Sequence, residues 1–223
     1  MFNLKKLLFG GAGTPANLAP DVAAGVAQWR ALPAVSGDDV HFHARYVVVD
    51  VSVAGLDVRE DALLGIAAVG MSRGALIKPG EVLAIDLSAG AEDDGEAFDR
   101  RLLAFLQFAG KCPLVSYRVP FVSSFLQNAF SERLGVDFHP EWIDLAWVLT
   151  DLFKETSETV VPRDTWLETF GIEGSAGRDP VVNALALARL LQVALPRASE
   201  RGADTPAKII EISKARRFLR QGA

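Results

Sequence analysis

Two residues with polar oxygen atoms interrupt an otherwise apolar stretch. The segment from Tyr46 to Val53 reads YVVVDVSV, and its two exceptions are Asp50 and Ser52. The β-branched, apolar composition predicts a buried strand, and residues two apart on a strand project from the same face. A buried ionised Asp is costly unless a cation or a hydrogen-bond donor compensates its charge. Asp50 is therefore a candidate metal ligand or a member of a buried ion pair.

The elements expected around this strand predict its place in the fold. A second apolar run, 62–69, follows a short polar link and predicts a hairpin. Strands and helices then alternate: a third strand within 75–87 interrupted at 78–80, a helix at 97–108, a strand at 114–116, a helix at 121–134, a strand from 142, and helices at 145–153, from Asp164 to Gly171, and at 180–195 closed by Pro196. Such an order predicts an α/β fold, a mixed sheet with helices on both faces and Asp50 on a central strand.

The pattern around Asp50 resembles the first motif of the DEDD-type, DnaQ-like 3'–5' exonucleases, the family of the proofreading epsilon subunit of bacterial DNA polymerase III. That motif reads V-x-D-x-E-T-T-G-L-D. The matching residues here are Val48, Asp50, Gly55, Leu56 and Asp57. Ser52 stands where the family has Glu. The resemblance covers about residues 45–195 and implies a ribonuclease H-like fold. It also implies two divalent cations held by four carboxylates, with a His or Tyr that positions the attacking water.

Two further motifs keep their apolar anchors but lose their chemistry. G-H-N-x-x-F-D-x-x-F-L falls on residues 116–126, where Val122 replaces the metal-binding Asp. H-x-A-x-x-D-A-x-x-T-A places Arg178 at the His and Asn183 at the last Asp. Valine offers no oxygen, arginine cannot act as a general base, and asparagine offers only a neutral carbonyl oxygen. Asp50 is thus the one carboxylate left of four.

The resemblance, read with these substitutions, implies a catalytically degenerate exonuclease-like module, a pseudoenzyme that binds nucleic acid or a protein partner. An alternative is a residual or single-metal 3'–5' exonuclease that uses Asp50, Asn183 and Asp179 on single-stranded nucleic acid. Another is a regulatory domain that binds a nucleotide through Arg118 or Arg178. No metal or other cofactor is expected, and Mg²⁺ or Mn²⁺ at Asp50 belongs to the exonuclease alternative. The sequence leaves open whether the chain is an enzyme.

The charge of Asp50 also needs a partner. We expect the permanent cation of Arg178 to reach Asp50, directly or through water, in place of the missing metals. Asn183 and Ser52 could equally donate to Asp50. A third possibility is that Arg178 points into solvent from the loop at 173–178.

The 223 residues carry a net charge of −5, so any contact with nucleic acid must be local. We divide the chain into an N-terminal helical extension at 1–44, an exonuclease-like domain at 45–198, and a linker with a basic C-terminal helix at 199–223. Asp21 is the expected cap of the first helix. The last helix either contacts phosphates or, the interpretation we favour, docks through Ile209, Ile210, Ile212 and Phe218.

The remaining features favour ordinary roles. The single cysteine, Cys112, is expected to be a reduced core thiol. His41 and His43, two apart before the first strand, lack local ligand partners and are not expected to bind metal. The apolar part of residues 1–13 is too short for an export or membrane segment, so we expect a cytoplasmic protein without membrane contact.

Overall fold

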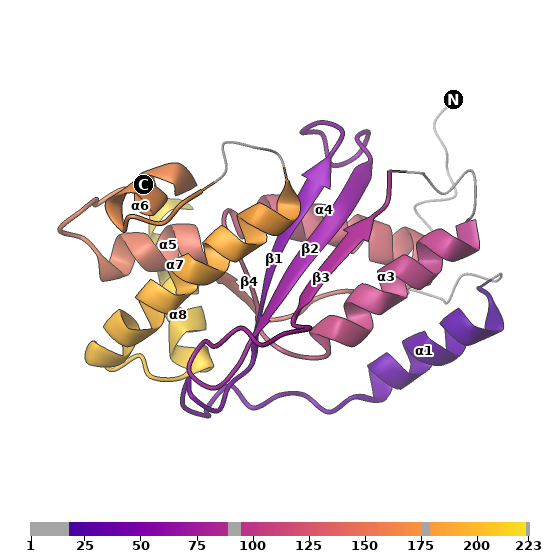
Figure 1. Ribbon diagram of the computed structural model, residues 1–223, viewed down its shortest axis with the longest axis horizontal. Coiled ribbons are helices and arrows are strands. Elements are labelled where there is room, and N and C mark those ends of the chain that lie inside the picture. Colours follow the sequence, from indigo (N-terminus) through magenta and orange to yellow (C-terminus); the bar gives the residue numbers. More distant parts are fainter. Residues whose placement is uncertain (1–17, 89–94, 175–178, 222–223) are drawn as a thin grey trace.

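A computed structural model describes residues 18–88, 95–174 and 179–221, with the backbone alone at 216–221. Its centre is a five-stranded mixed sheet with the strand order β3-β2-β1-β4-β5 (Figure 1). The strands are β1 Tyr46–Val53, β2 Leu63–Met71, β3 Val82–Asp86, β4 Leu114–Ser116 and β5 Trp142–Asp144. β1 pairs antiparallel with β2 and parallel with β4, and β5 pairs parallel with β4. The predicted fold class and the central position of β1 are confirmed.

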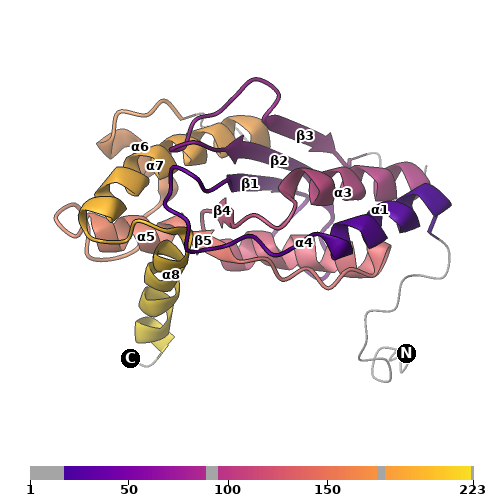
Figure 2. The ribbon, with the colours of Figure 1, turned by 90° about the horizontal axis from the view of Figure 1, so that it is seen from below.

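Helices cover both faces of the sheet (Figures 1 and 2). One face packs against α5 Leu145–Leu152, α6 Arg163–Thr169, α7 Pro180–Glu200 and α8 Pro206–Gln221, and we call this layer the α7-side core. The other packs against α1 Pro20–Ala31, α3 Gly95–Ala109 and α4 Val119–Leu134, and we call it the α4-side core. β1 contributes side chains to both the α7-side core and the α4-side core, because successive side chains of a strand point to opposite faces of the sheet. Tyr46 and Val48 enter the α7-side core, whereas Val47 and Val49 enter the α4-side core.

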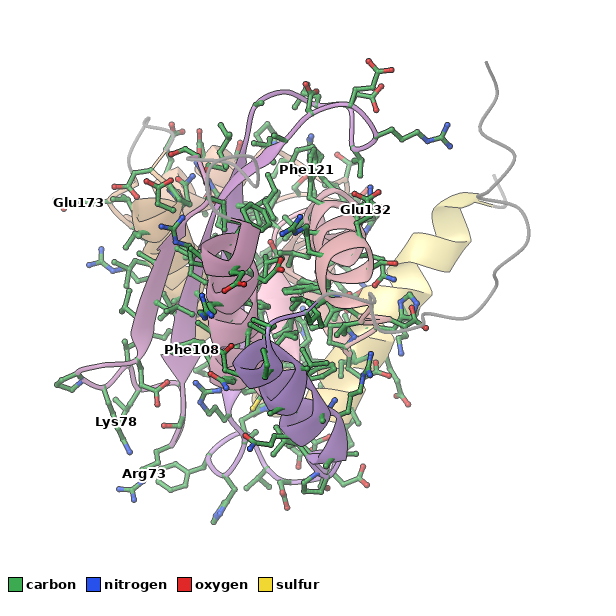
Figure 3. The ribbon with its side chains drawn as sticks, turned by 90° about the vertical axis from the view of Figure 1, so that its right-hand side faces the viewer. Arg73, Lys78, Phe108, Phe121, Glu132 and Glu173 are labelled. Carbon is green, nitrogen blue, oxygen red and sulfur yellow. The ribbon has the colours of Figure 1, made fainter. Side chains whose placement is uncertain are left out.

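The two ends of the sheet differ in what they carry. Figure 3 shows Arg73 and Lys78, which lie between β2 and β3, at one end, and Phe121 and Glu173 toward the other. The second is the carboxyl end of the parallel strands β1, β4 and β5. In α/β sheets with parallel strands, ligand sites commonly lie at this end. The residues singled out from the sequence, Asp50 and Asn183, lie there as well.

Three predicted helix ends are wrong for physical reasons. Asp21 does not cap α1, because it lies inside the first turn and its carboxylate binds Arg100. Asp164 likewise lies inside α6, whose cap position is Pro162. α7 does not stop at Pro196 but continues to Glu200. Burial of Ala198 in the α7-side core stabilises that last turn despite the backbone hydrogen bond that proline cannot donate.

The terminal helices are integral to the two cores. Val22, Val26 and Trp29 of α1 are buried in the α4-side core, as their spacing predicts. On α8, Ile209 and Ile210 are buried in the α7-side core, with Ile212 packed against it. This confirms docking through those three residues, whereas the side chain of Phe218 lies outside the described part of the chain.

The structure also shows the surroundings of Cys112 and of the long apolar helix α7. Cys112 is half-buried rather than buried, and its Sγ lies 3.6 Å from Nη1 of Arg45. α7 is long and apolar enough to cross a membrane by length and composition alone, and half of its apolar window is buried inside the protein. Its burial against the sheet is that of a core helix.

Candidate functional site

β1 brings Asp50 and Ser52 to the carboxyl end of the sheet. Both side chains project toward α7, on the same face as Val48. Asp50 pairs across the ladder with Ala67, and Ser52 pairs with Gly65. A Cβ atom at Gly65 would approach the Ser52 hydroxyl to 2.8 Å, so the glycine leaves room for that side chain. β2 thus opens the space in which the two polar side chains lie.

The first turn of α7 brings a polar side chain close to Asp50. Asp179 caps the helix, since its carboxylate accepts the backbone N–H of Val181 at 2.8 Å. One turn later, the side chain of Asn183 lies close enough to the Asp50 carboxylate to lower its pKa. Burial raises the pKa of Asp50 above its ordinary value, while Asn183 and the nearby charge of Arg163 oppose that rise. That Asn183 donates a hydrogen bond to Asp50, one of the alternatives from the sequence, stays a prediction.

Three side chains that the motifs did not single out complete what we call the Asp50 cluster: Tyr117, Arg163 and Trp166. Tyr117 follows β4, and its hydroxyl donates to the Val161 carbonyl oxygen at 2.5 Å. Burial raises the pKa of Tyr117 to about 12, and the charge of Arg163 acts on it in the opposite direction. Among the described residues, the buried indole N–H of Trp166 has no hydrogen-bond partner, although it lies close enough to Tyr117 to influence its pKa.

Among the described residues, Arg163 is the cation whose charge acts on Asp50. Its side chain, at the start of α6, is 22% exposed and forms an ion pair with Asp164 at 3.0 Å. The same guanidinium acts electrostatically on both Asp50 and Tyr117. The predicted partner, Arg178, lies outside the described residues, so its pairing with Asp50 stays a prediction. Sequence reasoning missed Arg163 because no motif marks it and 113 residues separate it from Asp50 along the chain.

Val122 does not belong to this cluster. Its side chain is 3% exposed and packs in the α4-side core, on the face of the sheet away from α7. Arg118 is exposed at the beginning of α4, in the left-handed region at φ 58°. The N–H groups of Arg118 and Val119 both donate to the Asp144 carboxylate, which fixes this turn. Whether Arg118 contacts nucleic acid stays a prediction.

Comparison with solved structures identifies the architecture. A structure of exonuclease I covers 71% of this chain and 43% of its own, with 16% identity and a TM-score of 0.50. E. coli exonuclease I in complex with a dT13 oligonucleotide covers 71% and 42%, with 14% identity and a TM-score of 0.51. The chain has the exonuclease fold. It has the ribonuclease H-like arrangement of the DEDD-type 3'–5' exonucleases and spans less than half the length of these exonuclease I chains.

Brucella melitensis NrnC with bound Mg²⁺ covers 86% of this chain and 90% of its own, with 16% identity and a TM-score of 0.49. No protein-family model and no curated protein matches the sequence. The exonuclease fold is therefore established by structure, from the two exonuclease I matches, while the chemistry of the site rests on the residues themselves.

These residues do not fit the two-metal centre of an exonuclease. Each cation of such a centre needs several oxygen ligands, and the four family positions hold one carboxylate, one hydroxyl, one amide and one isopropyl group. Asn183 and the charge of Arg163 already favour the ionised form of Asp50, so both compete with a divalent cation there. Within residues 18–88, 95–174 and 179–221, no group of three or more His, Cys, Asp or Glu could hold a metal ion.

The electrostatics of Asp50 give a stability prediction. Because its pKa is raised in the folded protein, the native state loses stability as pH rises from the ordinary aspartate pKa, about 3.9, through the raised value. We expect Asp50→Asn to raise Tm at pH 7.5 by about 2–4 °C, which corresponds to about 1 kcal/mol in a chain of this size. The gain should shrink as pH falls and vanish below the ordinary pKa. Calorimetric melts from pH 3.5 to 8 test this, and a lower Tm for Asp50→Asn at pH 7.5 would contradict it.

Proposed function

We propose that this protein is an exonuclease-fold module that binds single-stranded nucleic acid without two-metal hydrolysis. One observation carries the proposal: Asp50 is the single carboxylate at the four positions that the resemblance assigns, and in the described part of the chain no group of three or more His, Cys, Asp or Glu could hold a metal ion. The cluster keeps the place of an exonuclease site, at the carboxyl end of β1. What it lacks is the dense negative charge that would bind two cations.

Apart from Asp50, the described side chains of the cluster offer no base to activate water. Tyr117 has a pKa raised to about 12, so it stays protonated at neutral pH and cannot accept a proton. Its hydroxyl proton is already donated to Val161. Asp179, the acid nearest to the substituted third motif, is engaged as the cap of α7. Among the described residues, a phosphodiester at this site would therefore meet no paired metal centre, and Asp50 would be the one carboxylate left to act as a base.

Binding has a local source of positive charge although the whole chain is negative. Arg163 provides a guanidinium beside Asp50, and exposed Arg118 lies one strand away, after β4. Guanidinium groups bind phosphate oxygens with two parallel hydrogen bonds. E. coli exonuclease I, which shares this fold, is seen in complex with a dT13 oligonucleotide. These facts support single-stranded nucleic acid as the ligand class.

The test measures binding and cleavage on one probe. A 5'-fluorescein dT13 oligonucleotide is titrated with the protein in EDTA, in Mg²⁺ and in Mn²⁺, with anisotropy for binding and denaturing gels for length. We expect binding that does not depend on the metal and an oligonucleotide that stays full length. Arg163→Gln should weaken binding about 3–10-fold, as loss of a phosphate contact would. Arg201→Gln, at the other end of α7, is the matched control and should leave Kd unchanged.

Three outcomes would overturn this proposal. Shortening of dT13 in Mn²⁺ that is lost in Asp50→Ala would make the chain a single-metal exonuclease. Competition by dTMP as effective as that by dT13 would make it a nucleotide-binding domain. Absence of binding to dT13 at 100 µM protein would leave a protein partner as the ligand class.

A further inference from the structure

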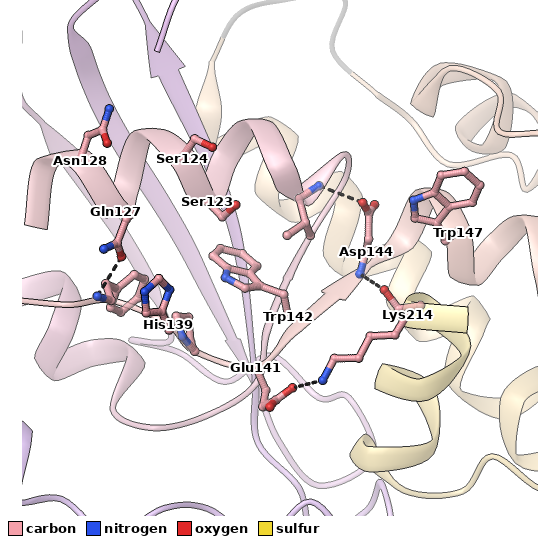
Figure 4. A pocket seen from close by; sticks show the side chains of 14 residues that line it. Ser123, Ser124, Gln127, Asn128, His139, Glu141, Trp142, Asp144, Trp147 and Lys214 are labelled. Carbon is pink, nitrogen blue, oxygen red and sulfur yellow. Dashed lines mark hydrogen bonds and ion pairs between the residues drawn. The ribbon is translucent and has the colours of Figure 1, made fainter. Parts of the chain in front are cut away.

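A groove lies along the outer edge of β5, between α4 and α8 (Figure 4). It encloses a cavity of about 480 Å³, a volume in the range of ligand sites. Figure 4 shows α4 along one side with Ser123 and Ser124, Trp142 on the strand, and Lys214 of α8 on the other side. At Asp144 and Val119 the groove reaches the carboxyl end of the sheet, next to Arg118.

On the outer edge of β5, the backbone N–H of Trp142 faces this groove as a hydrogen-bond donor. In the parallel ladder, Leu114 N–H donates to Glu141 O, so the N–H and C=O of Trp142 point away from β4. The next outward N–H, that of Asp144, donates to the Ser213 hydroxyl of α8 at 2.9 Å. Pro140, on the other side, has no N–H. Among the described residues, the Trp142 N–H has no acceptor, and an adjacent donor and acceptor of this kind match the edge of a nucleobase.

Two tryptophans offer aromatic surface beside that donor. Trp142 and Trp147 are both half-buried and both line the groove. Trp142 packs against the α4-side core. In the described part of the chain, neither indole stacks on another ring or lies under a cation, whereas Trp29 and Trp166 do one or the other. Indole faces in a groove are what single-stranded nucleic acid uses to stack its bases, whatever their sequence.

The charge on α8 suits a polyanion. Lys214, 56% exposed, pairs with Glu141 at 2.9 Å across the groove. Exposed pairs of this kind contribute little to stability and open readily. After Glu211, the sequence of α8 contains no acid but four basic residues: Lys214, Arg216, Arg217 and Arg220. α8 projects beyond the sheet (Figure 2), and Lys214 is its basic residue that lines the groove.

We propose that this groove, between α4 and α8, is a second contact for single-stranded nucleic acid, with a base stacked on Trp142 and a phosphate bound by Lys214. It rests on the proposed function, because the strand would cross from the Asp50 cluster over Arg118. The groove is separated from that cluster by β4, since β5 is the second strand from β1. A ligand bound at both places is held more tightly than at either alone.

The proposal is tested by removing a positive or a negative side chain from the groove, because the two changes should affect the affinity for nucleic acid in opposite directions. Fluorescein-dT13 is titrated by anisotropy at several salt concentrations with full-length variants. We expect Lys214→Gln to weaken binding about 3–10-fold and to reduce the salt slope by about one. Glu141→Gln, which frees Lys214, should tighten binding. Lys208→Gln is the matched control, because Lys208 lies on the same helix with similar exposure, 51%, and a similar carboxylate partner, Asp204.

Stacking is tested first by changing the ligand, with the wild-type protein. A 13-mer of abasic sites keeps the phosphates and should bind wild type about 10-fold more weakly than dT13. Trp142→Leu should remove most of that difference, with near-UV circular dichroism to check its fold. Equal binding of dT13 by wild type and Lys214→Gln, or weaker binding by Glu141→Gln, would contradict the proposal that the groove binds nucleic acid. The effect of Arg163→Gln would still test binding at the Asp50 cluster separately. Equal affinity for the two 13-mers would overturn the stacking step.

Discussion

Val122→Asp, which restores the exonuclease carboxylate at this position, is expected to lower the stability of the protein by about 3–5 kcal/mol rather than to create a metal ligand. The side chain is 3% exposed and packs in the α4-side core. A carboxylate there would be buried without a partner, which is among the most costly single changes. In a chain of this size the expected fall in Tm is about 10 °C, measured by calorimetry at pH 7.5.

Two controls separate charge from shape. Val122→Asn has nearly the same size as Asp without its charge and should cost less. Val122→Ala removes only two methyl groups and should cost less again. Addition of 5 mM Mn²⁺ should leave the Tm of Val122→Asp unchanged. A rise in Tm with Mn²⁺, absent from Val122→Asn, would show that position 122 reaches Asp50 and that the chain retains the ligand geometry of an exonuclease.

The sequence predicts the framework of the site well because the framework depends on apolar spacing. The stretch Tyr46–Val53 is strand β1, and Leu114–Ser116 is strand β4, as composition alone indicates. Of the three apolar anchors of the second motif, Phe125 and Leu126 are buried on α4, and Phe121 is half-buried against the same core. Such positions are readable because a strand alternates with period two and a helix with period 3.6.

The partners of Asp50 are less accessible to sequence reasoning. Asn183 was found because a motif placed it opposite Asp50. Arg163 and Trp166 come from a short helix outside every motif, and only tertiary packing brings α6 to the carboxyl end of β1. The same limit applies to the groove along β5. Lys214 reads as one of several basic residues on a helix, and its place beside Trp142 depends on how α8 docks.

His41 shows how a residue outside the site can control the position of α8. Its Nε2 donates to the Ala203 carbonyl oxygen at 2.8 Å, in the turn between α7 and α8. Its Nδ1 lies 2.6 Å from the hydroxyl of Tyr46, on β1, and accepts that proton in the neutral tautomer. The imidazole is 7% exposed. Of the two His residues that flank Phe42, His41 is thus a buried structural residue and His43 is exposed.

We expect His41→Ala to destabilise the protein by about 2–4 kcal/mol at pH 7.5, because it leaves the buried Tyr46 hydroxyl and Ala203 carbonyl without partners. Burial lowers the pKa of His41 below its ordinary value, against the opposing effects of the Ala203 bond and the charge of Asp204. The neutral ring therefore stabilises the fold fully above the unfolded pKa, about 6.5, and this stability is lost as pH falls through that value. The difference in stability between wild type and His41→Ala should accordingly narrow between pH 7.5 and 5.5.

Urea denaturation at both pH values measures that difference, with His43→Ala as the control. His43 is exposed and only two residues away, so its removal should change the free energy of unfolding by less than about 0.5 kcal/mol. If His41→Ala and wild type lost stability in parallel as pH falls, another group would be responsible for the acid sensitivity. A wider difference at pH 5.5 than at pH 7.5 would mean that the protonated ring is the better partner, with Asp204 outweighing burial.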